Sequence, residues 1–344
     1  MNTLFCLVSR QAMANVLPVL MYKPKNVVLF TTLEEKKSAD NLEKLFKSKD
    51  FNVLRKDNLN AYNYVAFKDV VKNELSKFQE DVWLNVTGGT KLMALAAYEA
   101  FVEKDRNIIY CNTENNEIIY LFPELKTEQL KLNLSIEDYL NAYGYELLEI
   151  KSHDVKEEYF ELFAYLYQNN LIQKFTVFLD NFRSQSAVDS NLKTFNDKKD
   201  KIFSIQKTVS AVLLFIKDKK YKFTDDRFLK GEWLEYFIQW SLKKQNITPD
   251  VGVKIKSSSD VENEIDIMFI KNYQLNLISC KSGRRNDPNR DIYEIETLRN
   301  IAGGTFGKAF LVTAAPLTEP ILKRAEDLKI KTFTVESIHI PEFQ

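Results

Sequence analysis

The chain has 344 residues, which is enough for two domains that each bury a core of their own. Its 48 lysines and arginines are balanced by 48 aspartates and glutamates. This balance argues against polyanion binding over the whole surface and leaves only a local patch for any nucleic-acid site.

The cysteines and the apolar runs indicate where the protein works. Cys6, Cys111 and Cys280 lie far apart, with neither metal-ligand spacing nor an even-numbered disulfide framework, so they predict a protein of the reducing cytoplasm. The apolar first twenty residues lack a basic start and contain Arg10 and Gln11, which favours a first strand over a signal peptide. No apolar segment approaches the roughly 20 residues that span a bilayer, so no membrane contact is expected.

Residues 1–145 alternate between short apolar runs and helical patterns such as 34–49 and 90–104. Near-continuous apolar strands separated by amphipathic helices predict a mostly parallel sheet covered on both faces. The N-terminal part is therefore expected to be a doubly wound, Rossmann-like α/β domain. The expected strands are "TLFCLVS", "NVVLFTT", "DVWLNVT", "NIIYCNT" and "EIIYLF".

The rest of the chain divides into two parts. Residues 146–225 are rich in Phe, Tyr, Leu and Lys at helical spacing and nearly free of glycine, which predicts a helical connector. Residues 226–344 begin with the helical pattern "GEWLEYFIQWSLKKQ" and continue through a hairpin over 264–281, a helix over 292–301, the strand "KAFLVTA" and a final helix and strand. This order predicts a second α/β domain.

The stretch "NVTGGTKLMALAAYEAF", residues 85–101, joins an apolar strand to a strong helix former through two glycines. Open α/β sheets bind ligands at the carboxyl ends of their strands, and helix N-termini present free N–H groups to anions. Gly88 and Gly89 would let a phosphate approach the backbone. Thr87, Thr90 and Lys91 would add donors. The alternative is a plain strand-to-helix turn in which Thr90 caps the helix.

Other polar residues are expected at the same edge of the sheet, because they follow the predicted strands. Hydroxyl and amide groups with few charges suit a ligand that carries bases and riboses as well as phosphates. The alternative is that they are ordinary loop residues. These candidates are Ser9, Gln11, Asn15, Thr31, Thr32, Asn112 and Thr113.

The segment "ENEIDIMFIKNYQLNLISCKSG", residues 262–283, places two apolar strands around the polar turn "KNYQ". Residues two apart in a strand share a face. A two-residue turn would set Asp266 opposite Ser279 and Glu264 opposite Lys281. Such oxygen ligands suit Mg²⁺ or Mn²⁺, with a lysine to orient water or neutralise charge. The alternative is a solvent-facing polar side with cross-strand charge pairs.

A third acid lies upstream, in "GEWLEYF". Glu232 and Glu235 are three residues apart on the predicted helix and project to roughly the same side, so one of them could reach a metal held by the hairpin. A solvated helix face is the alternative for both.

The order of a helix glutamate, a strand aspartate and a second strand ending in x-x-Lys is similar to the PD-(D/E)xK core of restriction endonucleases and Holliday-junction resolvases. The phrases "GEWLEYF", "NEIDIMFI", "LISCK" and "ETLRNIAGGTFGKAFLVT" resemble one branch of it, the CRISPR-associated nucleases of type III systems. These join a CARF (CRISPR-associated Rossmann fold) domain to a restriction-endonuclease-like domain. The stretch "NVTGGTKLMALAAYEAF" resembles the CARF signature, whose loop cradles a cyclic oligoadenylate. The resemblance covers nearly the whole chain except the connector.

The resemblance assigns catalytic roles to Glu235, Asp266 and Lys281. The position two before the lysine is an acid in the family and is Ser279 here, which puts the second metal ligand in doubt. The missing carboxylate is expected from Glu294 or Glu296 on the next helix, or from Glu264. The candidate metal ligands are Asp266, Glu235 and Cys280.

The resemblance also implies an activity, an activator and an assembly. The expected protein is a homodimer with Mn²⁺ or Mg²⁺ in its nuclease site, activated allosterically by cyclic tetra-adenylate, with a six-membered ring left open. It would cut DNA, single-stranded RNA or both. The residues themselves suggest that Arg284 and Arg285 of "CKSGRR", together with Arg290, draw the nucleic acid to the site, and the alternative is that these arginines belong to a surface loop. Two rival functions are a ligand sensor whose nuclease domain is a binding module and a ligand-independent DNA-repair nuclease.

Overall fold

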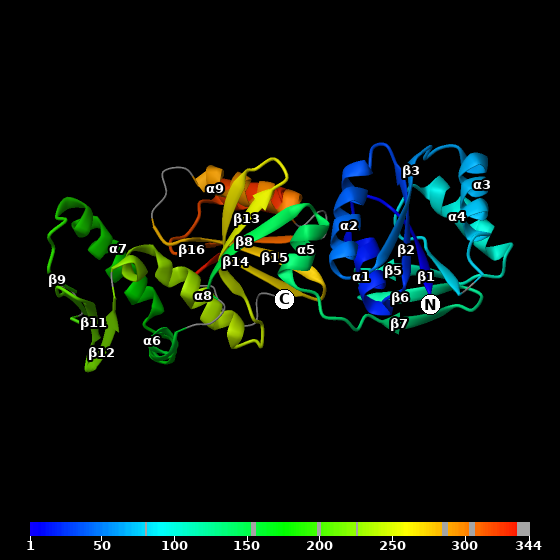
Figure 1. The fold of residues 1–344 in the computed structure, drawn as a ribbon. Helices are drawn as coiled ribbons and strands as arrows, with labels where there is room; N and C mark the ends of the chain where they lie inside the picture. The colour runs from blue at the N-terminus through cyan, green and yellow to red at the C-terminus, as the bar shows by residue number, and fades with distance from the viewer. Residues whose placement is uncertain are drawn as a thin grey trace.

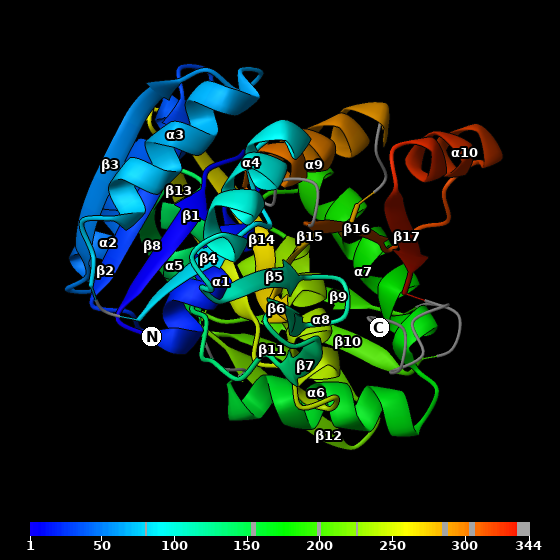
Figure 2. The same ribbon diagram turned by 90° about the vertical axis from the view of Figure 1, so that its right-hand side faces the viewer.

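Three sheets organise the molecule, and Figure 1 shows them in a row, with the N-terminal sheet at one end and a small four-stranded sheet at the other. In Figure 2 the N-terminal domain faces the viewer. The computed structural model describes residues 1–79, 81–152, 156–197, 201–224, 226–283, 288–302 and 307–335.

The N-terminal sheet has the strand order β3-β2-β1-β4-β5-β6-β7. Strands β1 to β5 run parallel, and β6 and β7 continue antiparallel at one edge. Side chains of β1 alternate between faces: Leu4 and Cys6 share a core with α1 and α2, whereas Phe5 and Leu7 share one with α3 and α4. This arrangement confirms the predicted doubly wound domain.

The elements of this domain have the following bounds: β1 Thr3–Leu7, α1 Met13–Tyr22, β2 Asn26–Thr32, α2 Lys36–Ser48, β3 Asn52–Leu59, α3 Tyr64–Leu75, β4 Val82–Asn85, α4 Lys91–Val102, β5 Ile108–Asn112, β6 Glu117–Phe122 and β7 Lys126–Gln129.

The junction between the two domains consists of α5 (Ile136–Ala142) and β8 (Tyr145–Ser152). Strand β8 pairs antiparallel with β13 of the C-terminal sheet, so the connector predicted from residue 146 begins with a strand of that sheet. The core formed by α1 and α2 continues through Tyr139 and Leu140 of α5 into β13 and β15. The two domains therefore share one continuous apolar core.

The prediction of a helical connector is wrong beyond its two helices. Helices α6 (Glu157–Gln168) and α7 (Ile172–Val188) are followed by a four-stranded antiparallel sheet of order β12-β11-β10-β9. These strands have three to five residues, too few for period-2 alternation to stand out from aromatic residues at helical spacing. We call residues 156–224 the inserted module. Its strands are β9 Thr194–Asn196, β10 Phe203–Lys207, β11 Val212–Ile216 and β12 Lys219–Phe223.

The C-terminal sheet has the order β17-β16-β15-β14-β13-β8, with β15, β16 and β17 parallel and the others antiparallel. Helix α8 and the inserted module share the core on one face, and α9 and α10 cover the other. The predicted hairpin, helix and strand are confirmed. The bounds are a π-helical turn Phe228–Glu232, α8 Trp233–Lys243, β13 Asp250–Ser257, β14 Glu262–Lys271, β15 Gln274–Lys281, α9 Pro288–Ala302, β16 Lys308–Thr313, α10 Glu319–Asp327 and β17 Ile330–Thr334.

Among the helices of the described ranges, none is both long enough and apolar enough to cross a membrane.

Candidate functional site

The β14–β15 hairpin closes through a two-residue turn, as its sequence predicts. Asn272 and Tyr273 both have positive φ, at 52° and 58°, which is the backbone of a hairpin turn whose twist matches its strands. The paired register runs from Lys271 opposite Gln274 to Ile267 opposite Ile278. The next positions along the two strands are Asp266 and Ser279, the pair expected from the sequence.

The Asp266 carboxylate holds the two strands together where the ladder ends. The backbone amide of Cys280 donates to Asp266 Oδ2 at 2.6 Å, and the Ser279 hydroxyl donates to the same oxygen at 3.2 Å. The Lys281 ammonium lies 3.9 Å from it. All three contacts involve Oδ2. Oδ1 has no hydrogen-bond or ion-pair partner among the described residues, so it is open to a ligand.

Lys281 lies between two carboxylates, and the second comes from a residue that sequence reasoning missed. Its Nζ is 4.0 Å from Oδ1 of Asp291, which is 5 % exposed in the first turn of α9. The signal was present in "DPNRD", because a proline followed by an acid in the first helical turn suits the helix N-terminus. The sequence instead predicts the displaced acid one turn later, at Glu294 or Glu296.

Glu235 comes from α8, which packs on the face of the sheet opposite α9. It lies in the first turn of α8, and burial raises its pKa from 4.5 to about 8, with repulsion from Asp266 adding to the shift. Lys151 of β8 opposes this shift and makes an ion pair of 2.8 Å with Glu232. The site thus holds several acidic side chains close together beside β14 and β15.

The remaining predicted nuclease residues are less well placed. Glu264 is exposed, and the paired register of β14 and β15 ends at Ile267 and Ile278, before it reaches Glu264 and Lys281. The charge of Glu264 nevertheless adds to the raised pKa of Glu235. Glu294 is exposed and Glu296 half-buried on α9, and within the described residues neither makes an ion pair with Lys281.

Cys280 faces the apolar core shared with α8. Burial, with the nearby charges of Asp266 and Glu235, raises the pKa of its thiol well above the ordinary value. A thiolate is the metal-binding form, so this setting argues against Cys280 as a ligand. Arg284 and Arg285 lie outside the described residues, and Arg290 lies in the first turn of α9.

Within the described residues, no three or more His, Cys, Asp or Glu side chains form a ready metal cluster. The donor set nevertheless fits a hard cation. Mg²⁺ is usually bound by one or two carboxylates and waters, and Asp266 and Glu235 supply two carboxylates whose mutual repulsion a cation would relieve. The residues present therefore fit Mg²⁺ or Mn²⁺ better than a thiolate-bound metal.

At the N-terminal domain, the glycine loop crosses the carboxyl end of β1, which lies between β2 and β4 where the strand order reverses. A Cβ on Gly88 would lie 2.0 Å from the Leu7 carbonyl oxygen and 3.4 Å from Ser9 Oγ, and Gly89 has a φ of 72°. The glycines are thus required by close packing against β1, whatever else approaches the loop.

A buried hydrogen-bond network occupies several of the predicted ligand residues. Asn15 is fully buried and donates to the Leu7 carbonyl, while Asn85 donates to Asn15 Oδ1 and to the Ala14 carbonyl. The Thr87 hydroxyl donates to Asn85 Oδ1 and accepts from the Cys111 amide at 2.6 Å. Asn15 therefore supports the site from beneath and does not reach its surface.

The other predicted ligand residues differ in exposure. Thr31 and Thr32 are buried, and Asn112 donates to Glu117 at 2.9 Å. Thr90 caps α4 by accepting from the Met93 amide, so the capping alternative is correct for this residue. Ser9, Gln11 and Thr113 are half-buried, and Lys91 is exposed at the first position of α4.

Comparisons with known proteins agree with the division into two domains. Residues 3–139 match the family described as Card1 CARF domain, and residues 222–339 match the family described as Card1-like, endonuclease domain. A comparison with curated proteins finds no match.

Three solved structures span nearly all of the chain. Can2 from Sulfobacillus thermosulfidooxidans in complex with cyclic tetra-adenylate is 26% identical, with a TM-score of 0.78 over 97% of this chain and 95% of Can2. Protein VC1899 from Vibrio cholerae is 20% identical, with a TM-score of 0.77 over 97% and 94% of the two chains.

The third is a type III CRISPR defence DNA nuclease activated by cyclic oligoadenylate. It is 18% identical, with a TM-score of 0.60 over 96% of this chain and 50% of that chain. It and VC1899 share the fold. With both family matches in order along one chain, this protein belongs to the CRISPR-associated CARF-domain nucleases, as a Card1 CARF domain followed by a Card1-like endonuclease domain.

Proposed function

We propose that this protein is a metal-dependent endonuclease that a cyclic oligoadenylate, most simply cyclic tetra-adenylate, activates to cut DNA, single-stranded RNA or both. The observation that carries the proposal is the half-buried Glu235 carboxyl group near Asp266 and the ammonium of Lys281, with the pKa of Glu235 raised to about 8 by desolvation and by the charge of Asp266. Carboxylates held this close together repel one another, and a bound cation would relieve that repulsion. Glu235 and Asp266 both lie within 222–339, the range that matches the Card1-like endonuclease domain, and this match supports the proposal.

The residues in named roles are Asp266, Glu235 and Lys281. Asp266 Oδ1 and Glu235 would hold Mn²⁺ or Mg²⁺, which when bound polarises the scissile phosphate and makes a bound water more acidic. Lys281, 12 % exposed between Asp266 and Asp291, presents a fixed positive charge to the phosphate and orients the attacking water. The Cys280 amide keeps Asp266 in place through its 2.6 Å bond.

The activator site is proposed at the carboxyl edge of the CARF sheet. Backbone N–H groups at the start of α4 and the exposed Lys91 favour a phosphate. Can2 was solved with cyclic tetra-adenylate, a ring whose symmetry suits two copies of this edge related by a two-fold axis.

A homodimer through the CARF domain also accounts for its exposed apolar residues. Side chains at the carboxyl edge of β2 and around the starts of α3 and α4 are solvent-exposed in the single chain, and an apolar surface of this kind favours a protein partner. They are Leu33 at 68 %, Tyr62 at 78 %, Val65 at 67 % and Leu95 at 59 % exposure.

Two contacts could carry a signal from the CARF domain to the nuclease site. The Tyr273 hydroxyl, at the turn of the β14–β15 hairpin, donates to the Leu130 carbonyl at 2.9 Å, and Asp266 and Lys281 lie toward the other end of that hairpin. A pocket of about 290 Å³ lies between Arg10 and Ser38 of the CARF domain and Ser257–Ser259 after β13. Ring binding that shifts the CARF domain would therefore move the hairpin, provided the ring binds the active arrangement more tightly.

The test is cleavage of supercoiled plasmid, single-stranded DNA and single-stranded RNA with Mn²⁺, with and without cyclic tetra-adenylate, for the wild type and Asp266→Asn. We expect cleavage that requires both the ring and the metal and that falls about 1,000-fold or more in the variant, the range seen when a group essential to a catalytic unit is removed. Asp260→Asn is the matched control, because Asp260 is exposed in the turn before β14 and, among the described residues, forms an ion pair with Lys256 alone.

A ligand sensor with an inactive nuclease domain is the second candidate, and Ser279 favours it. This hydroxyl donates to Asp266 where the family has a carboxylate. Tight ring binding by calorimetry, with no cleavage of any of the three polymers, would establish the sensor and refute the nuclease. Full cleavage without any ring would instead support a ligand-independent repair nuclease.

A further inference from the structure

One arginine of the inserted module reaches into the nuclease domain next to the candidate catalytic residues. Arg183 lies on α7, and its side chain is 16 % exposed. Nη1 donates to Ser282 Oγ at 3.0 Å and to the Lys230 carbonyl at 3.2 Å. Nη2 donates to the Ser282 carbonyl and pairs with Asp180 of the same helix. A single guanidinium is thus shared among three segments of the chain.

The two distant segments are the ones that carry the nuclease residues. Ser282 directly follows Lys281 at the end of β15. Lys230 lies in the π-helical turn that leads into α8, five residues before Glu235. Single π-helical turns are rare and often occur at functional sites. Arg183 therefore ties the backbone that positions Lys281 to the backbone that positions Glu235.

The geometry of the contact requires an arginine in particular. The planar guanidinium presents several donors in a rigid fork and remains charged at every physiological pH, whereas lysine offers one compact ammonium. The two tied segments already lie close together, because a Cβ on Gly231 would be 3.6 Å from Ser282 Oγ. Losing the guanidinium would remove the donor that the Lys230 and Ser282 carbonyl groups share and would release both segments.

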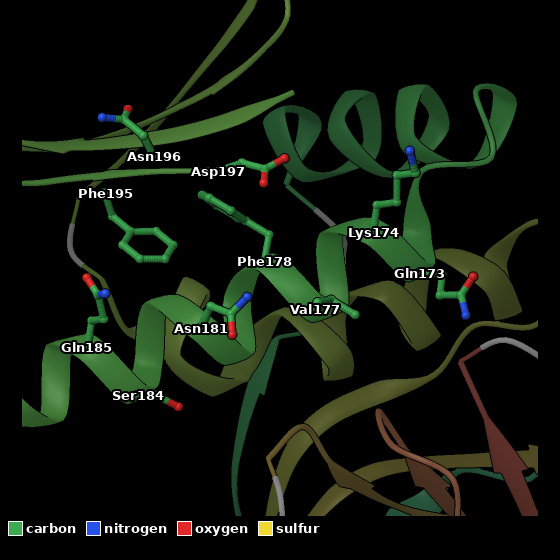
Figure 3. Close-up of a pocket in the computed structure, with 10 residues that line it drawn as sticks. All are labelled: Gln173, Lys174, Val177, Phe178, Asn181, Ser184, Gln185, Phe195, Asn196 and Asp197. Carbon is green, nitrogen blue, oxygen red and sulfur yellow. The ribbon is translucent and has the colours of Figure 1, made fainter. Parts of the chain in front are cut away.

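The opposite face of α7 offers a control surface. A groove of about 480 Å³ lies between this helix and β9, and Figure 3 shows Asn181, Lys174 and Gln185 along it. At 3.6 residues per turn, positions 174, 181 and 185 fall on the side of the helix away from Arg183. Substitutions there change the inserted module without touching the tie.

We propose that Arg183 is a positioning residue of the nuclease site, through which the inserted module fixes the positions of Lys281 and Glu235 relative to each other. The inference rests on the proposed nuclease function. Arg183 contacts no reacting atom, so its loss should lower kcat and leave substrate binding nearly unchanged. A small displacement of catalytic groups is costly to the rate because reaction requires close alignment.

The experiment compares full-length Arg183→Ala, Arg183→Lys and Ser282→Ala with the control Asn181→Ala. Two readouts are used: kcat and KM for ring-activated cleavage, and amide hydrogen exchange of peptides covering 229–235 and 279–283. For Arg183→Ala we expect kcat to fall about 10- to 100-fold with KM within about twofold, and faster exchange in both peptides. Arg183→Lys and Ser282→Ala should show smaller losses, and added methylguanidinium should restore part of the kcat of Arg183→Ala.

Each outcome decides the proposal. An Arg183→Ala protein with the kcat and the exchange of Asn181→Ala would overturn it, as would a loss confined to KM. If Arg183→Ala does not fold, kcat is compared among the wild type, Ser282→Ala and Arg183→Lys instead. Equal kcat values for these three proteins would overturn the proposal. If the wild type cleaves no polymer, the proposed function fails separately, and unchanged exchange at 279–283 in Arg183→Ala would still refute the tie.

Discussion

The CARF edge and the nuclease edge of this molecule both have polar residues at strand ends, but the hydrogen bonding and the charge around these residues differ. At the CARF edge, Asn15, Asn85 and Thr87 satisfy one another and nearby backbone groups in a neutral, buried network. At the nuclease edge, Asp266 and Asp291 approach the single ammonium of Lys281, while the pKa of a neighbouring glutamate rises.

The contrast shows two ways in which a fold prepares a site. A neutral network is complete without a ligand and builds a rigid floor whose surface groups do the binding. Crowded carboxylates are unfavourable without a ligand and gain most when a cation arrives. The CARF edge should therefore respond to substitution mainly through its shape, and the nuclease edge mainly through its charge.

Shape at the CARF edge is tested most strongly by Gly88→Ala. Because the added Cβ would lie 2.0 Å from the Leu7 carbonyl oxygen, the loop must move, and we expect the free energy of unfolding to fall by about 4 kcal/mol with loss of ring binding. Urea unfolding and calorimetric titration measure these effects. Gly283→Ala is the control, since nothing lies within 4 Å of its Cβ. Equal stability of the two variants would remove the argument from shape.

Charge at the nuclease edge predicts a pH dependence for Glu235→Gln. The folded protein holds the Glu235 proton up to a pKa of about 8, whereas the unfolded chain releases it near 4.5. The metal-free wild type therefore loses stability as pH rises through this window. Glutamine removes the effect, so the stability of the variant relative to wild type should rise by about 3 kcal/mol between pH 5 and pH 8.5. Thermal unfolding at several pH values measures it.

The control for this prediction is Glu319→Gln, at a site with 78 % side-chain exposure on α10. Its stability should follow the wild type at every pH. Mn²⁺ should raise the melting temperature of the wild type more at pH 8.5 than at pH 5, because protons compete with the metal for Glu235. Parallel pH curves for wild type and Glu235→Gln would contradict the assignment.

The carboxylate that replaces the acid missing at Ser279 can be identified by comparing Asp291→Asn with Glu294→Gln and Glu296→Gln. Asp291 is buried 4.0 Å from Lys281 Nζ, so losing its charge should lower the cleavage rate about 30-fold, on the order of 2 kcal/mol. Single-turnover cleavage with Mn²⁺ measures the rates. A greater loss in either glutamate variant would restore the interpretation based on sequence alone.

The smallest effect is expected for Lys91→Ala at the CARF edge. Lys91 is exposed beside the glycine loop, so its loss should weaken ring binding about tenfold, close to 1.4 kcal/mol, and leave stability unchanged. The effect should shrink as salt is added, because it is a charge interaction near solvent. Lys104→Ala, beyond the other end of α4, is the control. Equal affinities for the ring would show that the backbone amides alone hold the phosphate.

Much of the architecture could be predicted because local sequence patterns determine it. The apolar runs of β1, β2, β4 and β5 predicted these strands of the CARF sheet, and the turn between Lys271 and Gln274 predicted the register of the nuclease hairpin. The four short strands of the inserted module could not be predicted, since each is too short to show a period and is stable only through pairing with its neighbours.

The sequence by itself determined which chemical groups are present and which of them share a strand: Asp266 across from Ser279, with Lys281 two residues further. Only the tertiary structure decided that Asp291 and Arg183 join them, because both come from helices that pack onto the sheet from other parts of the chain. It also decided that Asn15 lies beneath the ligand edge and that the groups packed around the half-buried Glu235 desolvate it, which raises its pKa. Burial and long-range proximity depend on how whole elements pack, and no local pattern encodes them.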